Sequence, residues 1–133
     1  MQIVEREREG IVIVDCVGQL VAGESTGAVR ERLSQLVGRG SIQLILNLEG
    51  VTYIDSSGLG ALVMCFSTAR RAGGTMKLLN LSRRSIELIV LTRLEMVFEV
   101  FNEEQSAVNS FFPDREIKKF DILSFLQQRK TEE

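Results

Sequence analysis

The residues of this chain best suited to chemistry are Asp55, Ser56 and Ser57, which are followed by Gly58. An apolar run precedes them, and a helical pattern of apolar residues begins directly after them. Hydroxyl groups at the start of a helix lie near free backbone N–H groups and the positive end of the helix dipole. A phosphate group on Ser56 or Ser57 would therefore lie in favourable electrostatic surroundings. The plainer interpretation is that one of the two serines only caps the helix.

Several kinds of enzyme are excluded by what the sequence lacks. There is no histidine, so a Ser-His-Asp or Cys-His arrangement cannot form, and no glycine-rich phosphate loop is present. Cys16 falls in a strand-like run and Cys65 in a helical one, which predicts two core thiols rather than a disulfide or a zinc site. An enzyme acting through Asp55 and Ser56 would have no evident base. We therefore expect a binding protein without catalytic residues, cofactor or metal.

Composition is that of a soluble globular protein. The chain has 133 residues, of which 44% are hydrophobic and 26% charged, and its net charge is −2. These values predict a single domain and argue against a nucleic-acid partner. No signal peptide or membrane-spanning run is evident, so we expect a cytoplasmic protein with no membrane partner.

Strand and helix patterns alternate along the chain and predict an α/β fold. The expected sheet is mixed and mostly parallel, with about five strands, an N-terminal hairpin at one edge and four helices. A loop is expected at 49–53, between the third strand and Asp55. The expected strands are 2–9, 10–17, 41–48, 76–81 and 96–101, and the expected helices are 24–37, 56–71, 82–91 and one that begins after Asn102.

Polar residues predict how these helices begin. Ser25 or Thr26 is expected to cap the first helix, and Ser82 or Ser85 the third. Asn102 is expected to cap the fourth, with Gln105 as its capping-box partner.

The unbroken segment from Leu46 to Leu62 resembles the signature of the STAS family, and most closely that of the bacterial anti-sigma-factor antagonists. The resemblance implies that Ser56 is phosphorylated by a serine kinase that is also the anti-sigma factor, and that a serine phosphatase reverses the modification. It also implies a partner surface around Ser56. If a partner backbone approaches Gly58 closely, a Gly58→Val variant would keep the fold and lose binding. The expected partner-binding residues are Asp55, Ser57, Gly58, Leu59 and Gly60.

Two positions depart from the family pattern. Val21 stands where these antagonists usually carry an aspartate near the phosphorylation site, and Arg93 stands where they often have glycine. Two other interpretations are open, and the missing acid favours the first. One is a STAS subunit of a larger assembly that is not phosphorylated. The other is a module that senses a nucleotide or anion at the same helix N-terminus.

Pro113 is expected to end a STAS domain over residues 1–112, and residues 113–133 form an extension. Phe120, Leu123 and Leu126 recur at helical spacing. We therefore expect an amphipathic helix that docks on its own domain, on a second copy in a homodimer, or on a partner. The apolar cluster comprises Phe120, Ile122, Leu123, Phe125 and Leu126.

Overall fold

A computed structural model describes residues 1–132, with side chains described through Gln127. Its five strands form one sheet in the order β1-β2-β3-β4-β5. The β1–β2 pair is antiparallel and the other three pairs are parallel, which confirms the predicted α/β fold with an N-terminal hairpin at one edge. The strands are β1 (Gln2–Arg8), β2 (Ile11–Leu20), β3 (Gln43–Ile54), β4 (Thr75–Leu79) and β5 (Val100–Phe101), and the helices are α1 (Glu24–Gly38), α2 (Ser56–Arg71), α3 (Arg83–Leu91), α4 (Glu104–Asn109) and α5 (Ile122–Glu132).

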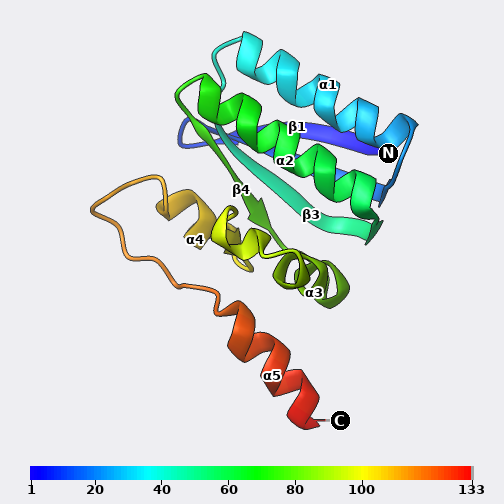
Figure 1. Ribbon diagram of the computed structural model, residues 1–133. Helices are drawn as coiled ribbons and strands as arrows, with labels where there is room; N and C mark the ends of the chain where they lie inside the picture. Colours follow the sequence, from blue (N-terminus) through cyan, green and yellow to red (C-terminus); the bar gives the residue numbers. More distant parts are fainter. Residues whose placement is uncertain (133) are drawn as a thin grey trace.

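Helices cover the two faces of the sheet unequally (Figure 1). The long helices α1 and α2 lie side by side over one face, and with α3 they enclose the main hydrophobic core. The short helix α4 covers a smaller apolar cluster on the other face. Cys16 and Cys65 are buried in the main core as predicted, and burial raises the pKa of both thiols. The main core therefore fixes α2, which carries the Asp55–Ser56 segment at its start.

Strand β3 is longer than predicted, because the expected loop at 49–53 is part of the strand. Gly50 resembles a turn residue, but here it allows close contact with β2. A Cβ atom at Gly50 would lie 2.7 Å from Val17 Cγ2 and 2.9 Å from the Cys16 carbonyl oxygen. The pairing register of β2 with β3 shifts at this point, as in a β-bulge. The strand thus runs on to Ile54 and delivers Asp55 to the end of the sheet.

Strand β5 is shorter than predicted, since only Val100 and Phe101 pair with β4. A short 3-10 helix at Leu94–Met96 replaces the first part of the expected strand 96–101. Arg93 precedes it with φ of 61°, in the left-handed region that glycine adopts most readily. This backbone conformation explains why glycine would suit the position of Arg93. Phe98 is buried all the same, with its ring 5.4 Å from that of Phe66 in an edge-on contact.

Helix caps are the least accurately predicted features. Ser82 is confirmed, because its Oγ accepts the Ser85 N–H at 3.1 Å at the start of α3. The predicted caps of α1 and α4 are wrong. Helix α1 begins after Gly23 with no side-chain cap, and α4 begins after Glu103 rather than Asn102. The polar residues expected to cap these helices make other hydrogen bonds: Ser25 with the Val21 backbone, Thr26 with the Gly23 carbonyl, and Gln105 with Arg8 and Asn109.

A cluster of charged side chains joins the edge strand to α4. Arg6 of β1 donates to Asp15 of β2 at 2.7 Å and pairs with Glu104 of α4. Arg8 pairs with the same glutamate, and these two arginines lower the pKa of Glu104 to about 2, Arg6 contributing more. The charges on β1 therefore do more than protect an exposed edge from unwanted pairing.

The expected helix in the extension is confirmed as α5, although the residues that seat it differ from the prediction. Phe120 precedes the helix, and Phe120 and Ile122 pack against the main core. Leu123, one of the three residues expected to dock, is 61% exposed. Arg83 Nη2 donates to the Leu126 carbonyl at 2.9 Å, which ties α5 to α3. The end of the predicted extension, Glu133, lies outside the described residues, and its predicted pairing with a second copy stays a prediction.

Phe120→Ala is expected to lower the free energy of unfolding by about 1–2 kcal/mol, less than for a fully buried phenylalanine because the side chain is half-buried. Leu123→Ala is the matched control and should change stability by less than about 0.5 kcal/mol. Urea denaturation of the full chain measures both. Equal effects of the two substitutions would contradict the seating of the extension on the core.

Candidate functional site

The candidate site is the junction between the end of β2 and the start of α2. Asp55 is joined to both, since its N–H donates to the Leu20 carbonyl at 3.2 Å and its own carbonyl accepts the Leu59 N–H at 2.9 Å. Leu20 ends β2 and Ile54 ends β3, and both residues are buried in the main core. Because the strands are fixed by the core, the first turn of α2 starts from a rigid base.

Asp55, and neither serine, is the residue that caps α2. Its Oδ1 accepts the Gly58 N–H at 2.7 Å, and its Oδ2 accepts the Ala22 N–H at 3.2 Å from the loop between β2 and α1. These backbone donors, with Gly58 the largest contributor, lower the pKa of Asp55, so the carboxylate is ionised near neutral pH. The plainer interpretation, in which Ser56 or Ser57 only caps the helix, is therefore wrong.

Both serines are consequently free for other chemistry. Ser56 and Ser57 are the first two residues of α2 and both are exposed. Within the described part of the chain, neither hydroxyl makes a hydrogen bond. The backbone N–H groups of a first helical turn have no partner inside the helix. Although Asp55 already accepts the Gly58 N–H, a negatively charged group on Ser56 would still lie at the positive end of a 16-residue helix.

Gly58 and Leu59 face the protein interior rather than a partner. Gly58 is buried, and a Cβ atom there would lie 2.1 Å from the Leu20 carbonyl oxygen, far inside contact distance. The close approach to Gly58 is thus made by β2 of the same chain, so the geometry reverses the expectation that Gly58→Val keeps the fold. Leu59 is buried in the core, whereas Gly60 is exposed with open space around it. Of the five expected contact residues, Ser57 and Gly60 are exposed, and Asp55 is half-buried.

The loop that carries Val21 lies against the site even though the family aspartate is missing. Its Ala22 N–H binds Asp55, as described above, and the Val21 N–H donates to Ser25 Oγ at 3.0 Å. The side chain of Val21 is half-buried. Asp55 is therefore the carboxylate that the described structure places directly beside Ser56.

Two residues at this end of the molecule were missed by sequence reasoning. Tyr53 lies in β3 two residues before Asp55, and the guanidinium carbon of Arg84 lies 5.2 Å from the centre of its ring. Arg84 belongs to the first turn of α3, where two arginines occur without any acidic residue. That arrangement opposes the helix dipole. Two arginines in the first turn of an expected helix are a pattern that could have been noticed in the sequence.

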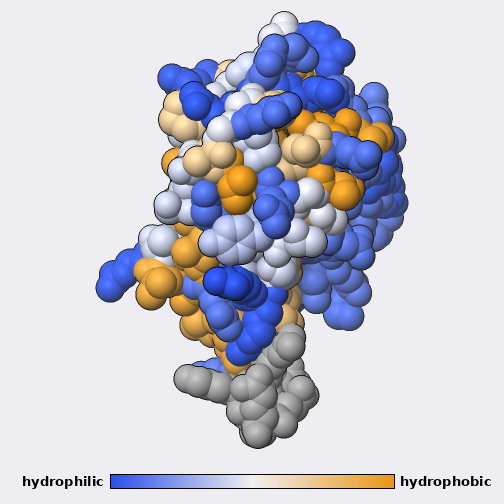
Figure 2. Space-filling model, turned by 90° about the vertical axis from the view of Figure 1, so that its right-hand side faces the viewer, coloured by the Kyte–Doolittle hydropathy of each residue, from blue (hydrophilic) through white to orange (hydrophobic). Residues whose placement is uncertain are grey.

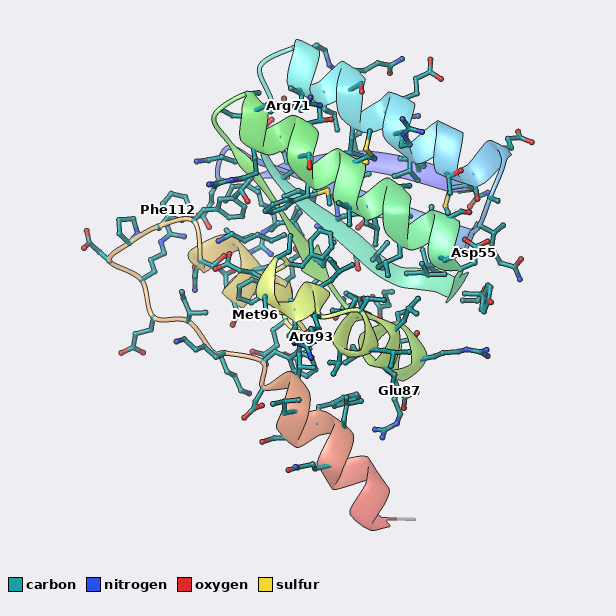
Figure 3. The ribbon with its side chains drawn as sticks, viewed as in Figure 1. Asp55, Arg71, Glu87, Arg93, Met96 and Phe112 are labelled. Carbon is teal, nitrogen blue, oxygen red and sulfur yellow. The ribbon has the colours of Figure 1, made fainter. Side chains whose placement is uncertain are left out.

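The surface around the site is mostly of intermediate hydropathy. Figure 2 faces the end of the molecule that lies on the right in Figure 3, where Asp55 is labelled. Many side chains in the middle of this face are pale, with single hydrophobic and hydrophilic ones between them. Arg71 marks the opposite end of α2 (Figure 3). A partner that docks at the start of α2 would thus meet small, uncharged groups beside the Asp55 carboxylate.

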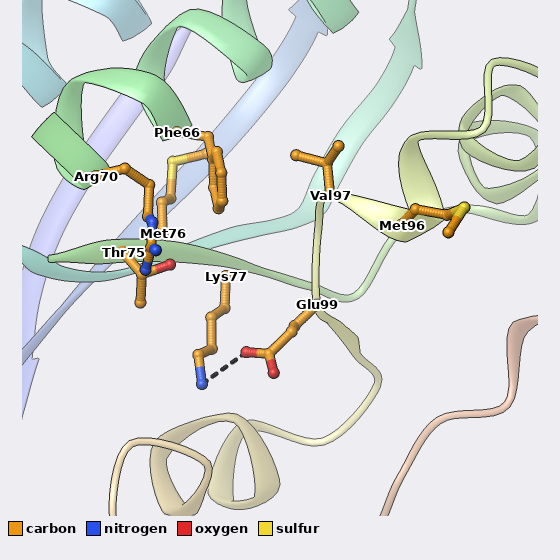
Figure 4. Close-up of a pocket in the computed structure, with 8 residues that line it drawn as sticks. All are labelled: Phe66, Arg70, Thr75, Met76, Lys77, Met96, Val97 and Glu99. Atoms are coloured by element: carbon orange, nitrogen blue, oxygen red, sulfur yellow. Dashed lines mark ion pairs between the residues drawn. The ribbon is translucent and has the colours of Figure 1, made fainter.

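A hollow of about 600 Å³ lies away from this site, near the end of α2 (Figure 4). Its lysine, Lys77, is already paired with Glu99 at 2.7 Å and also donates to Ser110 Oγ at 2.8 Å. The described residues hold no group of three or more side chains suited to bind a metal ion. The hollow is lined by Phe66, Arg70, Thr75, Met76, Lys77, Met96, Val97 and Glu99.

Comparison with known proteins identifies the family. The family model described as "STAS domain" matches residues 2–107. An anti-sigma-B factor antagonist of Bacillus subtilis (strain 168) is 36% identical over 92 residues, which cover 66% of this chain and 84% of that protein.

Two solved structures share the fold at lower identity. A putative anti-sigma factor antagonist from Thermotoga maritima has a TM-score of 0.76 and 19% identity, over 81% of this chain and 92% of that one. The Bacillus cell fate determinant SpoIIAA in its phosphorylated form has a TM-score of 0.65 and 20% identity, over 83% of this chain and 99% of that one. None of the helices in the described chain has the length and apolar character needed to cross a membrane. The match to the family model over residues 2–107 and the 36% identity to the Bacillus subtilis antagonist show that the chain belongs to the STAS domain family, as a member of the bacterial anti-sigma-factor antagonist type.

Proposed function

We propose that this protein binds a serine kinase that is also an anti-sigma factor, and that phosphorylation of Ser56 ends the binding. The observation that carries this proposal is the capping of α2 by Asp55, which leaves the Ser56 hydroxyl exposed and without a hydrogen-bond partner among the described residues. The relative from Bacillus subtilis is an anti-sigma-B factor antagonist, and SpoIIAA, which shares the fold, has a phosphorylated form.

The proposed mechanism is a change of charge at a fixed helix start. Without phosphate, the exposed Ser56, Ser57 and Gly60 present small neutral groups, while the buried Gly58 and Leu59 keep the helix seated. In the cytoplasm, where ATP is available, the kinase adds about 1.5 to 2 negative charges to Ser56. These charges lie beside a carboxylate that is already ionised, so a partner surface suited to the neutral site is repelled. A serine phosphatase restores binding.

Incubation with ATP and the cognate anti-sigma-factor kinase, followed by intact mass measurement, tests the proposal. The wild-type protein should gain one phosphate group, and phosphopeptide mapping should place it on Ser56. Ser57→Ala should be modified like the wild type and Ser56→Ala should not. A phosphate found on Ser57, with Ser56→Ala still modified, would contradict the assignment.

A second function is favoured by one observation, the presence of Val21 in place of the family aspartate beside the site. The same surface would then bind a partner permanently, as a STAS subunit of a larger assembly that is not phosphorylated. The mass measurement separates the two functions. A stable complex with the partner and no gain of phosphate would favour the subunit.

A further inference from the structure

We propose that Arg84, held against the ring of Tyr53, binds an acidic side chain on the partner that docks at the start of α2. This inference rests on the proposed function, because it assigns part of the same binding surface. Arg84 lies outside the segment from Leu46 to Leu62 that resembles the family signature.

Arg84 lies in the first turn of α3, against a residue at the end of β3. Tyr53 is 37% exposed and lies two residues before Asp55, the cap of α2. The guanidinium carbon of Arg84 lies 5.2 Å from the centre of the Tyr53 ring, within the range of a cation–π contact. The contact joins α3 to the end of β3, so Arg84 borders the surface that contains Ser56.

Arg84 and its neighbour Arg83 differ in the contacts they make within the chain. Arg83 is engaged within the chain, since it pairs with Glu87 at 3.1 Å and donates to the Leu126 carbonyl. Arg84 is exposed and makes neither a hydrogen bond nor an ion pair within the described residues. Its charge also lies in the first turn of α3, where the helix dipole disfavours a cation. Apart from the contact with the Tyr53 ring, no described contact inside the chain offsets this unfavourable interaction with the helix dipole.

A guanidinium held against a ring is suited to recognise a carboxylate. The ring restricts the guanidinium and leaves its N–H donors open, so less freedom is lost when it binds. A planar guanidinium matches a carboxylate through two parallel hydrogen bonds. A protein partner offers that group as an aspartate or glutamate. Such a contact would also be sensitive to phosphorylation, because negative charge on Ser56 would compete for Arg84 and repel the carboxylate of the partner.

Arg84→Gln is expected to weaken binding of the unphosphorylated protein to the cognate anti-sigma-factor kinase about tenfold, and to reduce the salt dependence of the dissociation constant. Arg71→Gln removes the same charge at the far end of α2 and should leave affinity within twofold (Figure 3). Tyr53→Phe keeps the ring and should bind like the wild type, whereas Tyr53→Ser should weaken binding. Calorimetry or surface plasmon resonance at two salt concentrations measures these effects, with thermal unfolding to show that each variant is folded.

Wild-type affinity and salt dependence in a folded Arg84→Gln protein would overturn the inference and leave the proposed function intact. Unchanged binding before phosphorylation, with faster removal of phosphate from Ser56 by the phosphatase, would assign Arg84 to the phosphate of its own chain and would also overturn it. A wild-type protein that binds no kinase and gains no phosphate would refute the proposed function itself and with it this contact.

Discussion

Gly58→Ala is expected to lower the free energy of unfolding by about 3 kcal/mol or more, although alanine normally stabilises a helix. The added Cβ would lie 2.1 Å from the Leu20 carbonyl oxygen and 3.0 Å from Ile54 Cγ2. A backbone carbonyl at the end of a core strand cannot move aside cheaply, so the strain exceeds the usual cost of overpacking. The start of α2 would have to lift away from β2. Urea denaturation followed by circular dichroism measures the loss.

Gly60→Ala is the matched control, because it makes the same change two residues later in the same helix. The Cβ at Gly60 meets no atom within 4 Å outside the backbone of its own helix, so the variant should gain about 0.5–1 kcal/mol from the helix propensity of alanine. Opposite signs for the two substitutions would establish the internal contact of Gly58. If Gly58→Ala unfolded like the wild type, α2 would not be seated on β2 as described.

Ser56→Asp is expected to lose about a hundredfold in affinity for the anti-sigma-factor kinase, a change of about 2.7 kcal/mol. The new carboxylate would lie next to Asp55, whose charge is held by the Gly58 N–H and other backbone donors. Ser56→Ala keeps a small neutral group and should bind without being released by ATP. Equilibrium binding with and without ATP distinguishes the two variants.

Ser34→Asp serves as the control for charge alone, since Ser34 is exposed on α1. It should bind like the wild type and still be released by ATP. If Ser56→Asp and Ser56→Ala bound the kinase equally well, the charge at Ser56 would not control the complex.

Most of the fold could be predicted from the sequence because apolar periodicity is strong along this chain. Residues such as Leu44, Ile45 and Leu46 are fully buried in a central strand, as a continuous apolar run indicates. The errors occur where one residue type has two possible uses. Gly50 lies in the loop expected at 49–53, but it accommodates a β-bulge contact between two strands that lie far apart in the sequence. Phe98 resembles part of a strand but enters the core from an irregular segment.

The start of α2 at Ser56 was predicted correctly, but the arrangement of the residues around it was predicted only in part. The sequence places Asp55, Ser56 and Ser57 at a helix start and suggests a serine as the cap, yet the hydrogen bond from the Gly58 N–H to the Asp55 side chain assigns that role to Asp55. The role of Gly58 depends on the end of β2, nearly forty residues earlier, which no local pattern reveals. Tyr53 and Arg84 were missed for the same reason, since they meet only after α3 has folded against β3.

The ion pair between Arg6 and Glu104 has a consequence for how the protein is made. The two residues are 98 positions apart, so β1 leaves the ribosome long before the glutamate that neutralises its arginines. The β1–β2 hairpin can form early because its two strands adjoin in the sequence. Arg6 and Arg8 nevertheless stay without Glu104 until translation has passed α4. A nascent chain that stops before this helix keeps Arg8 without its glutamate, and Arg6 with Asp15 alone, beside an apolar sheet face that α4 does not yet cover.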